Sequence, residues 1–317
     1  MRLHPKKDIL LFEELLTVES AQKAKDCEVV SVFINSKVDK VVLDVLPKLR
    51  LITTRSTGFD HIHKEECKAR GILIANVPYY GENTVAEHAF ALILALSRNV
   101  HKSYIRTLRN DFSIDGLKGF DLNGKTLGVI GTGRIGMHVI RIAKGFGMHV
   151  LAFDAHQDVF LSEILHFNYV DMDTLLAQSD IISLHLPYTD STHHLINDDT
   201  IQKMKPGVLL INTARGGLID NNALIQALDQ NIVAGAGLDV LEGEEWIREE
   251  KQLLRHTEES SARLEELLKN HLLLSQDNVV FTPHIAFYSQ EALERILHST
   301  FASIDSFERG NLLNEVV

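Results

Sequence analysis

Short runs of Val, Ile and Leu alternate along the chain with longer stretches in which apolar residues recur at helical spacing. A continuous apolar run between turn residues is typical of a buried strand, and a recurrence every three to four residues is typical of an amphipathic helix. The strands that this pattern predicts are 28–35, 49–56, 71–77, 126–131, 149–154, 180–187, 207–215, 233–240 and 278–283. Helical patterns follow at 135–147, 221–231 and 289–309. This alternation predicts an α/β protein with parallel sheets covered by helices on both faces.

One long helical pattern, residues 83–110, separates the first three strands from the other six. It turns polar after Arg98, as expected of a helix that leaves one domain for another. We therefore expect two doubly wound domains. The first comprises 1–99 and 288–317 and is discontinuous, and the second, 100–287, is inserted into it. Residues 243–277 are charged and helical in character, which favours a solvated insertion or, alternatively, a flap over a site.

Composition narrows the classes of function. A net charge of −11 argues against a general binder of nucleic acid or of anionic membranes, because such a protein needs a basic face. The apolar run 89–96 is too short to cross a bilayer. Two cysteines, Cys27 and Cys67, fit a reducing compartment, so we expect a cytoplasmic protein. The 16 histidines include His193 and His194, but none has the spacing of a closed zinc site, and we expect no metal.

The most specific motif is GTGRIG at residues 131–136, which lies between a predicted strand and a predicted helix. Gly131 permits a tight turn, Gly133 lets the backbone approach a pyrophosphate, and Gly136 lets the helix lie close to the strand. A second strand ends in Asp154, about 20 residues further on, where a carboxylate accepts hydrogen bonds from a ribose and repels a 2′-phosphate. This arrangement predicts a dinucleotide site that prefers NAD to NADP.

Three further strands end in residues that carry chemistry. Arg215 follows one strand, acids of the segment 239–245 follow the next, and His284 follows the last. In open α/β sheets, ligands bind at the carboxyl ends of the strands, so these groups can converge. An arginine fork matches a carboxylate, and an imidazole exchanges protons near neutral pH. Together with a nucleotide motif they suit hydride transfer to a 2-keto acid, although each alone has an ordinary structural explanation.

The motifs GTGRIG, NTARGG, GLDVLEGE and TPHIAFY resemble those of the D-isomer-specific 2-hydroxyacid dehydrogenases, and are most similar to the D-lactate dehydrogenase branch. The resemblance extends over nearly the whole chain and includes TRSTGFDHI and NVPYYGENTVAEHAFALILALSR. It implies a Rossmann NAD-binding domain inserted into a flavodoxin-like substrate domain, a homodimer, and a 2-keto or 2-hydroxy acid as substrate.

The resemblance also implies residue roles. Arg215 would bind the substrate carboxylate, His284 would be the general acid/base, and Glu244 would pair with His284. Substrate contacts would come from Ser56, Thr57, Gly58, Tyr80, Arg215, His284, Phe287 and Tyr288. Cofactor contacts would come from Gly131, Gly133, Arg134, Ile135, Gly136, Asp154, His185, Pro187, Thr213, Ala214 and Asp239.

The chain departs from the family pattern at its short N-terminal stretch before residue 28, at His63 and at Leu241. These departures concern substrate preference and packing more than chemistry. Two other functions stay open at this stage. One is a dehydrogenase for a bulkier 2-keto acid, and the other is an NAD-sensing binding protein that resembles the corepressors of this fold.

Overall fold

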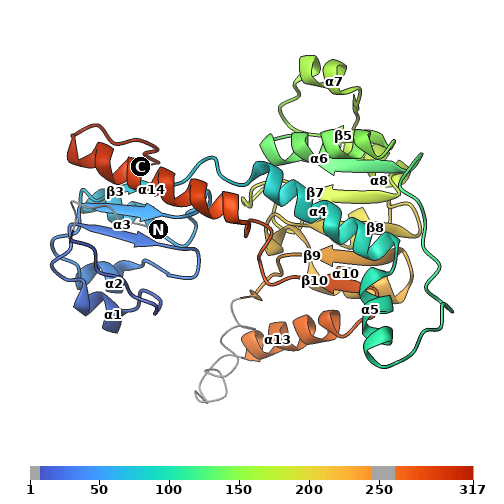
Figure 1. Ribbon diagram of the computed structural model, residues 1–317, viewed down its shortest axis with the longest axis horizontal. Coiled ribbons are helices and arrows are strands. Elements are labelled where there is room, and N and C mark those ends of the chain that lie inside the picture. Colours follow the sequence, from blue (N-terminus) through green and yellow to red (C-terminus); the bar gives the residue numbers. More distant parts are fainter. Residues whose placement is uncertain (1–7, 245–260, 317) are drawn as a thin grey trace. The chain divides into compact units, whose positions relative to one another are not determined.

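The computed structural model describes residues 8–244 and 261–316. It divides into two compact units, Met1–Tyr80 with Ser289–Val317, and Gly81–Tyr288 (Figure 1). The division after Tyr80 differs from the boundary near residue 100 that the sequence suggested. The helix that begins at Glu82 packs against strands of the second unit, so it belongs to that unit from its first turn.

The first unit is built on a three-stranded parallel sheet in the order β1-β2-β3. Its strands are β1 Val29–Val32, β2 Leu51–Thr54 and β3 Leu73–Ala75, and its helices are α1 Val18–Lys23, α2 Lys40–Asp44, α3 Lys64–Ala69 and α14 Gln290–Glu308. Helix α14 packs on β2, and Glu315 forms a bridge with Ala75, so both ends of the chain contribute to this unit.

The second unit contains a seven-stranded parallel sheet in the order β10-β9-β8-β7-β4-β5-β6. Its strands are β4 Thr126–Ile130, β5 His149–Phe153, β6 Asn168–Tyr169, β7 Ile181–Leu184, β8 Val208–Asn212, β9 Val233–Leu238 and β10 Val279–Phe281. Its helices are α4 Glu82–Ser97, α5 Val100–Leu108, α6 Arg134–Gly145, α7 Val159–Leu165, α8 Met172–Gln178, α9 Asp198–Ile201, η1 Gly216–Leu218, α10 Asn221–Asp229 and α13 Ser261–Leu274. The order reverses between β4 and β7, which is where a doubly wound sheet opens a crevice for a ligand.

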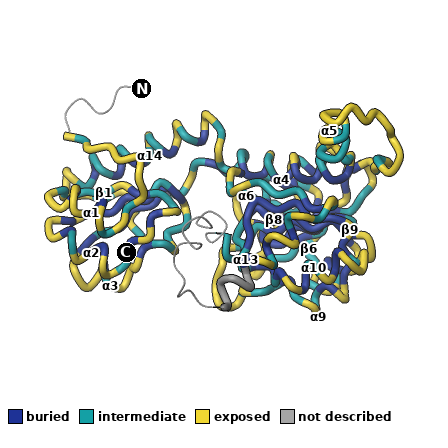
Figure 2. The backbone as a smooth tube through the Cα atoms, turned by 90° about the horizontal axis from the view of Figure 1, so that it is seen from below, coloured by how far each residue is buried: buried dark blue, intermediate teal, exposed yellow. Residues whose placement is uncertain are grey.

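Successive side chains along the central strands point to opposite faces of the sheet and belong to two separate hydrophobic cores. On β4, Val129 joins the core beneath α4 and α6, whereas Ile130 joins the core beneath α8, α9 and α10. On β8, Leu209 and Leu210 divide in the same way. Successive side chains of a strand point to opposite faces, so a strand that is apolar at every position must be covered on both. The buried strands are visible in Figure 2, and the α/β prediction is confirmed.

The predicted helix 83–110 is wrong as a single element. Asn99 adopts a left-handed conformation with φ 50°, and α4 therefore ends at Ser97 while α5 begins at Val100. Asparagine tolerates this conformation better than most residues, and it interrupts the helical hydrogen bonds. The short strand β6 was not predicted, and of the expected helical segment 243–277 only α13 lies in the described part of the chain. No helix among the described residues is long and apolar enough to span a bilayer.

Candidate active site

The loop between β4 and α6 requires its glycines at specific positions. Gly131 has φ +98°, and a Cβ there would lie 2.6 Å from the carbonyl oxygen of His185. A Cβ at Gly136 would collide with the carbonyl oxygen of Gly131, so the helix can lie this close only without a side chain. Gly133 is exposed with open space around its Cα, and it caps α6 without a side-chain hydrogen bond. The backbone N–H groups at this helix start fit a pyrophosphate.

Asp154 follows β5 and is fixed against this loop. Its Oδ2 accepts hydrogen bonds from the backbone N–H of Thr132 at 2.7 Å and from the Thr132 hydroxyl at 3.1 Å, while Oδ1 accepts from the N–H of His156. Burial alone would raise the pKa of Asp154, but these hydrogen bonds outweigh it and lower the pKa. The carboxylate is therefore held ionised beside the glycine loop, as a ribose acceptor must be.

Two further predicted cofactor residues line the ends of β7 and β8. His185 Nε2 lies 2.8 Å from the Ser183 hydroxyl, and burial lowers the pKa of His185 to about 3, so the ring is neutral at physiological pH. The Thr213 hydroxyl is buried and has no hydrogen-bond partner among the described residues. A buried, unsatisfied hydroxyl is rare in folded proteins, and this one fits a site that a cofactor completes.

The other predicted cofactor residues lie on the rim of the same strand ends. Arg134 and Pro187 are exposed, and Ile135 and Ala214 are partly buried. Arg134 Nη1 lies 3.7 Å from Glu82 Oε1 at the start of α4. Their predicted contacts with the cofactor remain predictions.

Arg215 is presented by a turn that Asn212 builds. The fully buried Asn212 side chain accepts a hydrogen bond from the N–H of Ala214 at 3.0 Å and donates one to the carbonyl oxygen of Arg215 at 2.8 Å. Asn212 is a residue that the sequence reasoning missed, although a polar residue at the end of an apolar strand was a usable signal.

Gly216 brings this turn against the segment that carries Glu244. A Cβ at Gly216 would collide with the backbone of Leu241 and Glu242, so only glycine permits the approach. The tertiary structure thereby packs the turn after β8 directly on the turn after β9. Arg215 and Glu244, 29 positions apart in the numbering, come from neighbouring segments of one site.

The side chains of His284 and Glu244 are in direct contact. Nδ1 of His284 lies 2.6 Å from Oε1 of Glu244, and both side chains are 19% exposed. Whether neutral or charged, the imidazole donates its Nδ1–H to the carboxylate. This hydrogen bond fixes the orientation of the ring and does not involve the second ring nitrogen, Nε2. His284 itself has φ 56°, an uncommon backbone conformation for a residue other than glycine.

Asp239 holds His284 in that conformation. Its carbonyl oxygen accepts the N–H of His284 at 2.8 Å, and its carboxylate accepts the N–H groups of Ile285 and Ala286. The Thr282 hydroxyl donates to the same carboxylate at 2.5 Å and lies 2.8 Å from Nε2 of His88. Burial would raise the pKa of Asp239, but these hydrogen bonds lower it. The sequence analysis assigned Asp239 to the cofactor and did not find His88 or Thr282; the structure gives Asp239 a role in supporting the loop.

The predicted substrate residues fall into both units. In the first unit, Ser56 is buried and donates to the carbonyl oxygen of Gly58 at 2.6 Å, and the Thr57 hydroxyl donates to the carbonyl oxygen of Val77. The carbonyl oxygen of Tyr80 accepts from Arg295 at 2.6 Å. In the second unit, the rings of Phe287 and Tyr288 meet edge to face, 5.8 Å apart.

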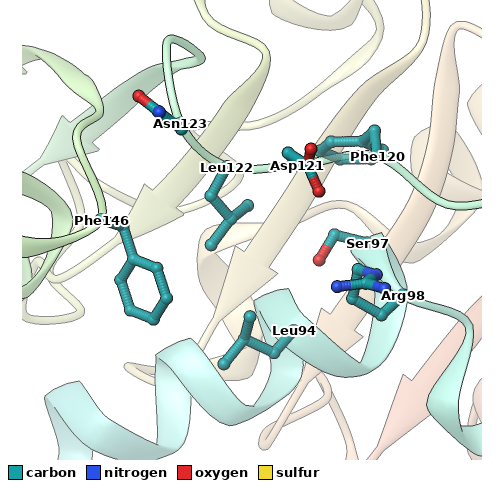
Figure 3. A pocket seen from close by; sticks show the side chains of 8 residues that line it. All are labelled: Leu94, Ser97, Arg98, Phe120, Asp121, Leu122, Asn123 and Phe146. Atoms are coloured by element: carbon teal, nitrogen blue, oxygen red, sulfur yellow. The ribbon is translucent and has the colours of Figure 1, made fainter.

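A surface pocket of about 260 Å³ lies elsewhere in the second unit (Figure 3). Its lining includes Ser97 and Leu94 of α4, the segment 120–123 that precedes β4, and Phe146, which precedes β5. The segment 120–123 and Phe146 lie before the amino ends of β4 and β5, whereas Arg215, Glu244 and His284 follow carboxyl ends. The pocket is therefore separate from the candidate active site.

Comparisons with known proteins give a consistent result. The sequence model described as "D-isomer specific 2-hydroxyacid dehydrogenase, NAD binding domain" matches residues 90–286. A D-lactate dehydrogenase of Escherichia coli is 38% identical over 98% of this chain and 92% of its own length. A solved pyruvate reductase of Chlamydomonas reinhardtii is 39% identical with a TM-score of 0.87, covering 95% of this chain and 89% of that one. A D-lactate dehydrogenase of Aquifex aeolicus, solved with NAD and lactic acid, is 42% identical with a TM-score of 0.81, covering 92% and 86%.

Proposed function

The chain belongs to the D-isomer-specific 2-hydroxyacid dehydrogenases and is an NAD-dependent oxidoreductase, and on that basis we propose that it reduces pyruvate to D-lactate. The observation that carries the proposal is the 2.6 Å contact between His284 and Glu244 at the end of β10, beside the turn that presents Arg215. Several similar proteins are described as D-lactate dehydrogenases or as a pyruvate reductase, which favours pyruvate among the 2-keto acids.

NADH, when bound, supplies the hydride for the keto carbon. We assign its binding to the glycine loop 131–136 and to Asp154, with Thr213 as the further hydroxyl that it would satisfy. The Asp154 carboxylate accepts hydrogen bonds but has no donor for a 2′-phosphate. Its negative charge also repels the phosphate. NADH should therefore be preferred to NADPH.

The chain's own side chains handle the substrate. Arg215 pairs with the carboxylate of pyruvate through its planar fork and thereby fixes the orientation of the keto group. His284 donates the proton from Nε2 to the oxygen that becomes the hydroxyl of D-lactate. Glu244 orients the ring through Nδ1 and offsets the positive charge of the donor form. The backbone of Ser56, Thr57 and Gly58, with Tyr80, Phe287 and Tyr288, is assigned to substrate contacts.

The test is oxidation of NADH by the purified protein with pyruvate, 2-ketoisocaproate and hydroxypyruvate, each matched with NADPH. We expect the largest kcat/KM with pyruvate and NADH, and D-lactate as the product by chiral chromatography. A larger kcat/KM with 2-ketoisocaproate would keep the chemistry and overturn pyruvate as the substrate. Tight NADH binding without turnover of any keto acid would overturn the proposed reaction.

We further propose a homodimer in the cytoplasm. Helix α5 has no buried residue, and its apolar side chains Val100, Tyr104, Ile105 and Leu108 are exposed together with Phe112 and Ile114 beyond it. Exposed apolar side chains that recur along one helix are typical of an interface, and a second copy of the chain is the partner that we propose. Both cysteines are free thiols, which fits a reducing compartment.

A further inference from the structure

A second group of chemically reactive side chains lies beside the active-site turns. His193, His194 and Glu242 each offer one ligand atom, and these atoms all lie within 4.8 Å of one another. Among the residues described, this is the one such group of three. The histidines are adjacent in sequence, but Glu242 lies 48 positions away, so the sequence alone could not group them. The prediction of no metal, drawn from sequence spacing, did not take this grouping into account.

The spacing is close to what a metal ion requires. Nε2 of His194 lies 2.9 Å from Oε2 of Glu242. Two ligands at about 2.0–2.1 Å from a tetrahedral zinc lie about 3.3 Å apart, so the pair needs only a small outward movement to admit an ion. The ring of His193 stacks on that of His194 with centroids 3.8 Å apart, which places a third nitrogen donor beside them.

Polar groups lie beside the Nδ1 atoms of both histidines. Nδ1 of His193 lies 3.1 Å from the Tyr188 hydroxyl, which leaves Nε2 for an ion. Nδ1 of His194 faces Oδ2 of Asp220 at 3.9 Å. A carboxylate or hydroxyl behind a ligating histidine fixes the tautomer and raises the affinity for the metal.

The backbone holds the same residues in place. His194 has φ 47°, and its N–H donates to the carbonyl oxygen of Gly217 at 2.9 Å while its carbonyl oxygen accepts from Asn197 at 3.0 Å. The carbonyl oxygen of Glu242 accepts from the buried Asn270 at 3.0 Å. Ordering these residues therefore costs little when an ion binds.

We infer that His193, His194 and Glu242 form a binding site for one divalent transition-metal ion of the zinc class. Imidazole and carboxylate are the donors that such ions prefer, and Glu242 with Asp220 gives the site a negative charge that attracts a cation. A bound ion would link the segment 188–194 to the turn 241–244. In that turn, the ligand Glu242 lies two residues before Glu244. This inference does not depend on the proposed substrate.

The test is isothermal titration of the EDTA-stripped, dialysed full-length protein with ZnCl₂. We expect one ion per chain. His194→Ala and Glu242→Gln should each weaken the affinity at least about 10-fold, and Asp220→Asn should weaken it about as much through the ring of His194. His298→Ala, an exposed histidine on α14, is the matched control and should leave the affinity unchanged.

Two further readouts distinguish the site from scattered surface binding. Zinc should raise the thermal midpoint of the wild type but not of His194→Ala or Glu242→Gln, because an ion that binds only the folded state stabilises it. CoCl₂ should give visible absorption bands that disappear in the same variants. The inference is overturned if Zn²⁺ affinity is the same in His194→Ala as in the wild type. It is equally overturned if His193→Ala leaves both the affinity and the cobalt spectrum unchanged, since the site would then lack its third ligand.

Discussion

His284 is the residue whose chemistry the sequence pointed to and whose geometry the structure supplied. A proline before it and a left-handed backbone place the imidazole beyond the end of β10, and Glu244 orients it at 2.6 Å. A ring held in this way is suited to deliver a proton repeatedly to one position, because its orientation is not lost between turnovers. The position of this ring, the proposed proton donor, thus depends on contacts from Asp239 and Glu244, which both follow β9.

The substitution His284→Ala should lower kcat with pyruvate by about 10²-fold or more, because it removes the proposed proton donor. The affinity for NADH should stay unchanged, since the glycine loop and Asp154 are untouched. Steady-state kinetics and NADH fluorescence titration measure the two quantities. Near-normal turnover in this variant would contradict the acid/base assignment.

Glu244→Gln should give a smaller loss of kcat than His284→Ala, because the ring keeps a hydrogen-bond partner but loses the negative charge beside it.

Thr282 should position His284 without touching the substrate. Thr282→Val keeps the shape but removes the hydroxyl that joins His88 to Asp239, and it leaves a buried carboxylate short of one donor. We expect a lower kcat, an unchanged KM for NADH and a loss of about 1–3 kcal/mol in the free energy of unfolding. Thr126→Val at the start of β4 is the matched control and should change neither. Unchanged kcat and stability in Thr282→Val would remove Thr282 from the support of the loop.

His185 should make the stability of the protein depend on pH. Its pKa is about 3 in the folded protein, below the usual value of 6.5, so the unfolded chain takes up the proton first as the pH falls. The contribution of neutral His185 to the free energy of unfolding is therefore fully present above pH 6.5 and is lost as the pH falls toward 3. The free energy of unfolding should change by up to about 1.4 kcal/mol per pH unit in this range. Urea unfolding at several pH values should show a shallower slope for His185→Gln. The exposed His298→Gln should keep the wild-type slope, and equal slopes in all three proteins would contradict the prediction.

At the scale of elements, α6 carries two glycines with opposite consequences. A side chain at Gly136 would collide with the carbonyl oxygen of Gly131, whereas Gly145 has open space around its Cα. The start of the helix is therefore constrained by the loop that it packs against, while its end is not.

Gly136→Ala should push the start of α6 away from the loop and weaken NADH binding by about 10-fold or more, the equivalent of about 1.4 kcal/mol. Gly145→Ala in the same helix should instead stabilise the protein by about 0.5–1 kcal/mol and leave NADH binding unchanged. Fluorescence titration with NADH and urea unfolding test both variants. Full NADH affinity in Gly136→Ala would argue against the close packing as a requirement for the cofactor.

At the scale of the whole molecule, the apolar surface of α5 determines the expected assembly. Leu108 is 66% exposed, and such a residue in a cluster of apolar neighbours is unusual for the surface of a monomer. Burying these side chains against a second copy would remove their apolar area from water.

Leu108→Glu should therefore convert a dimer into a monomer, because it places a charge in the proposed interface. Ile164→Glu on α7 is the matched control, an exposed apolar residue outside that surface, and should stay dimeric. Size-exclusion chromatography with light scattering measures the mass of each. A monomeric wild type would overturn the dimer.

The sequence by itself determined nine of the ten strands in the described part of the chain, and the family. All nine predicted strands are present, because a strand buried on both faces must be apolar along its whole length. The GTGRIG loop was recognisable, and Gly131 and Gly136 each answer a local steric need. The family resemblance, the class of enzyme and NAD as the cofactor were confirmed by proteins up to 42% identical.

The tertiary structure alone decided which residues meet. The resemblance implied that Glu244 pairs with His284, but only the tertiary structure places the two side chains 2.6 Å apart. His88 and Thr282 entered the site only through contacts between segments that lie far apart in the chain. The break at Asn99 and the division after Tyr80 were likewise absent from the apolar pattern. The physical reason is that periodicity records which face of an element is buried, whereas a site depends on distances between elements that lie far apart in the chain.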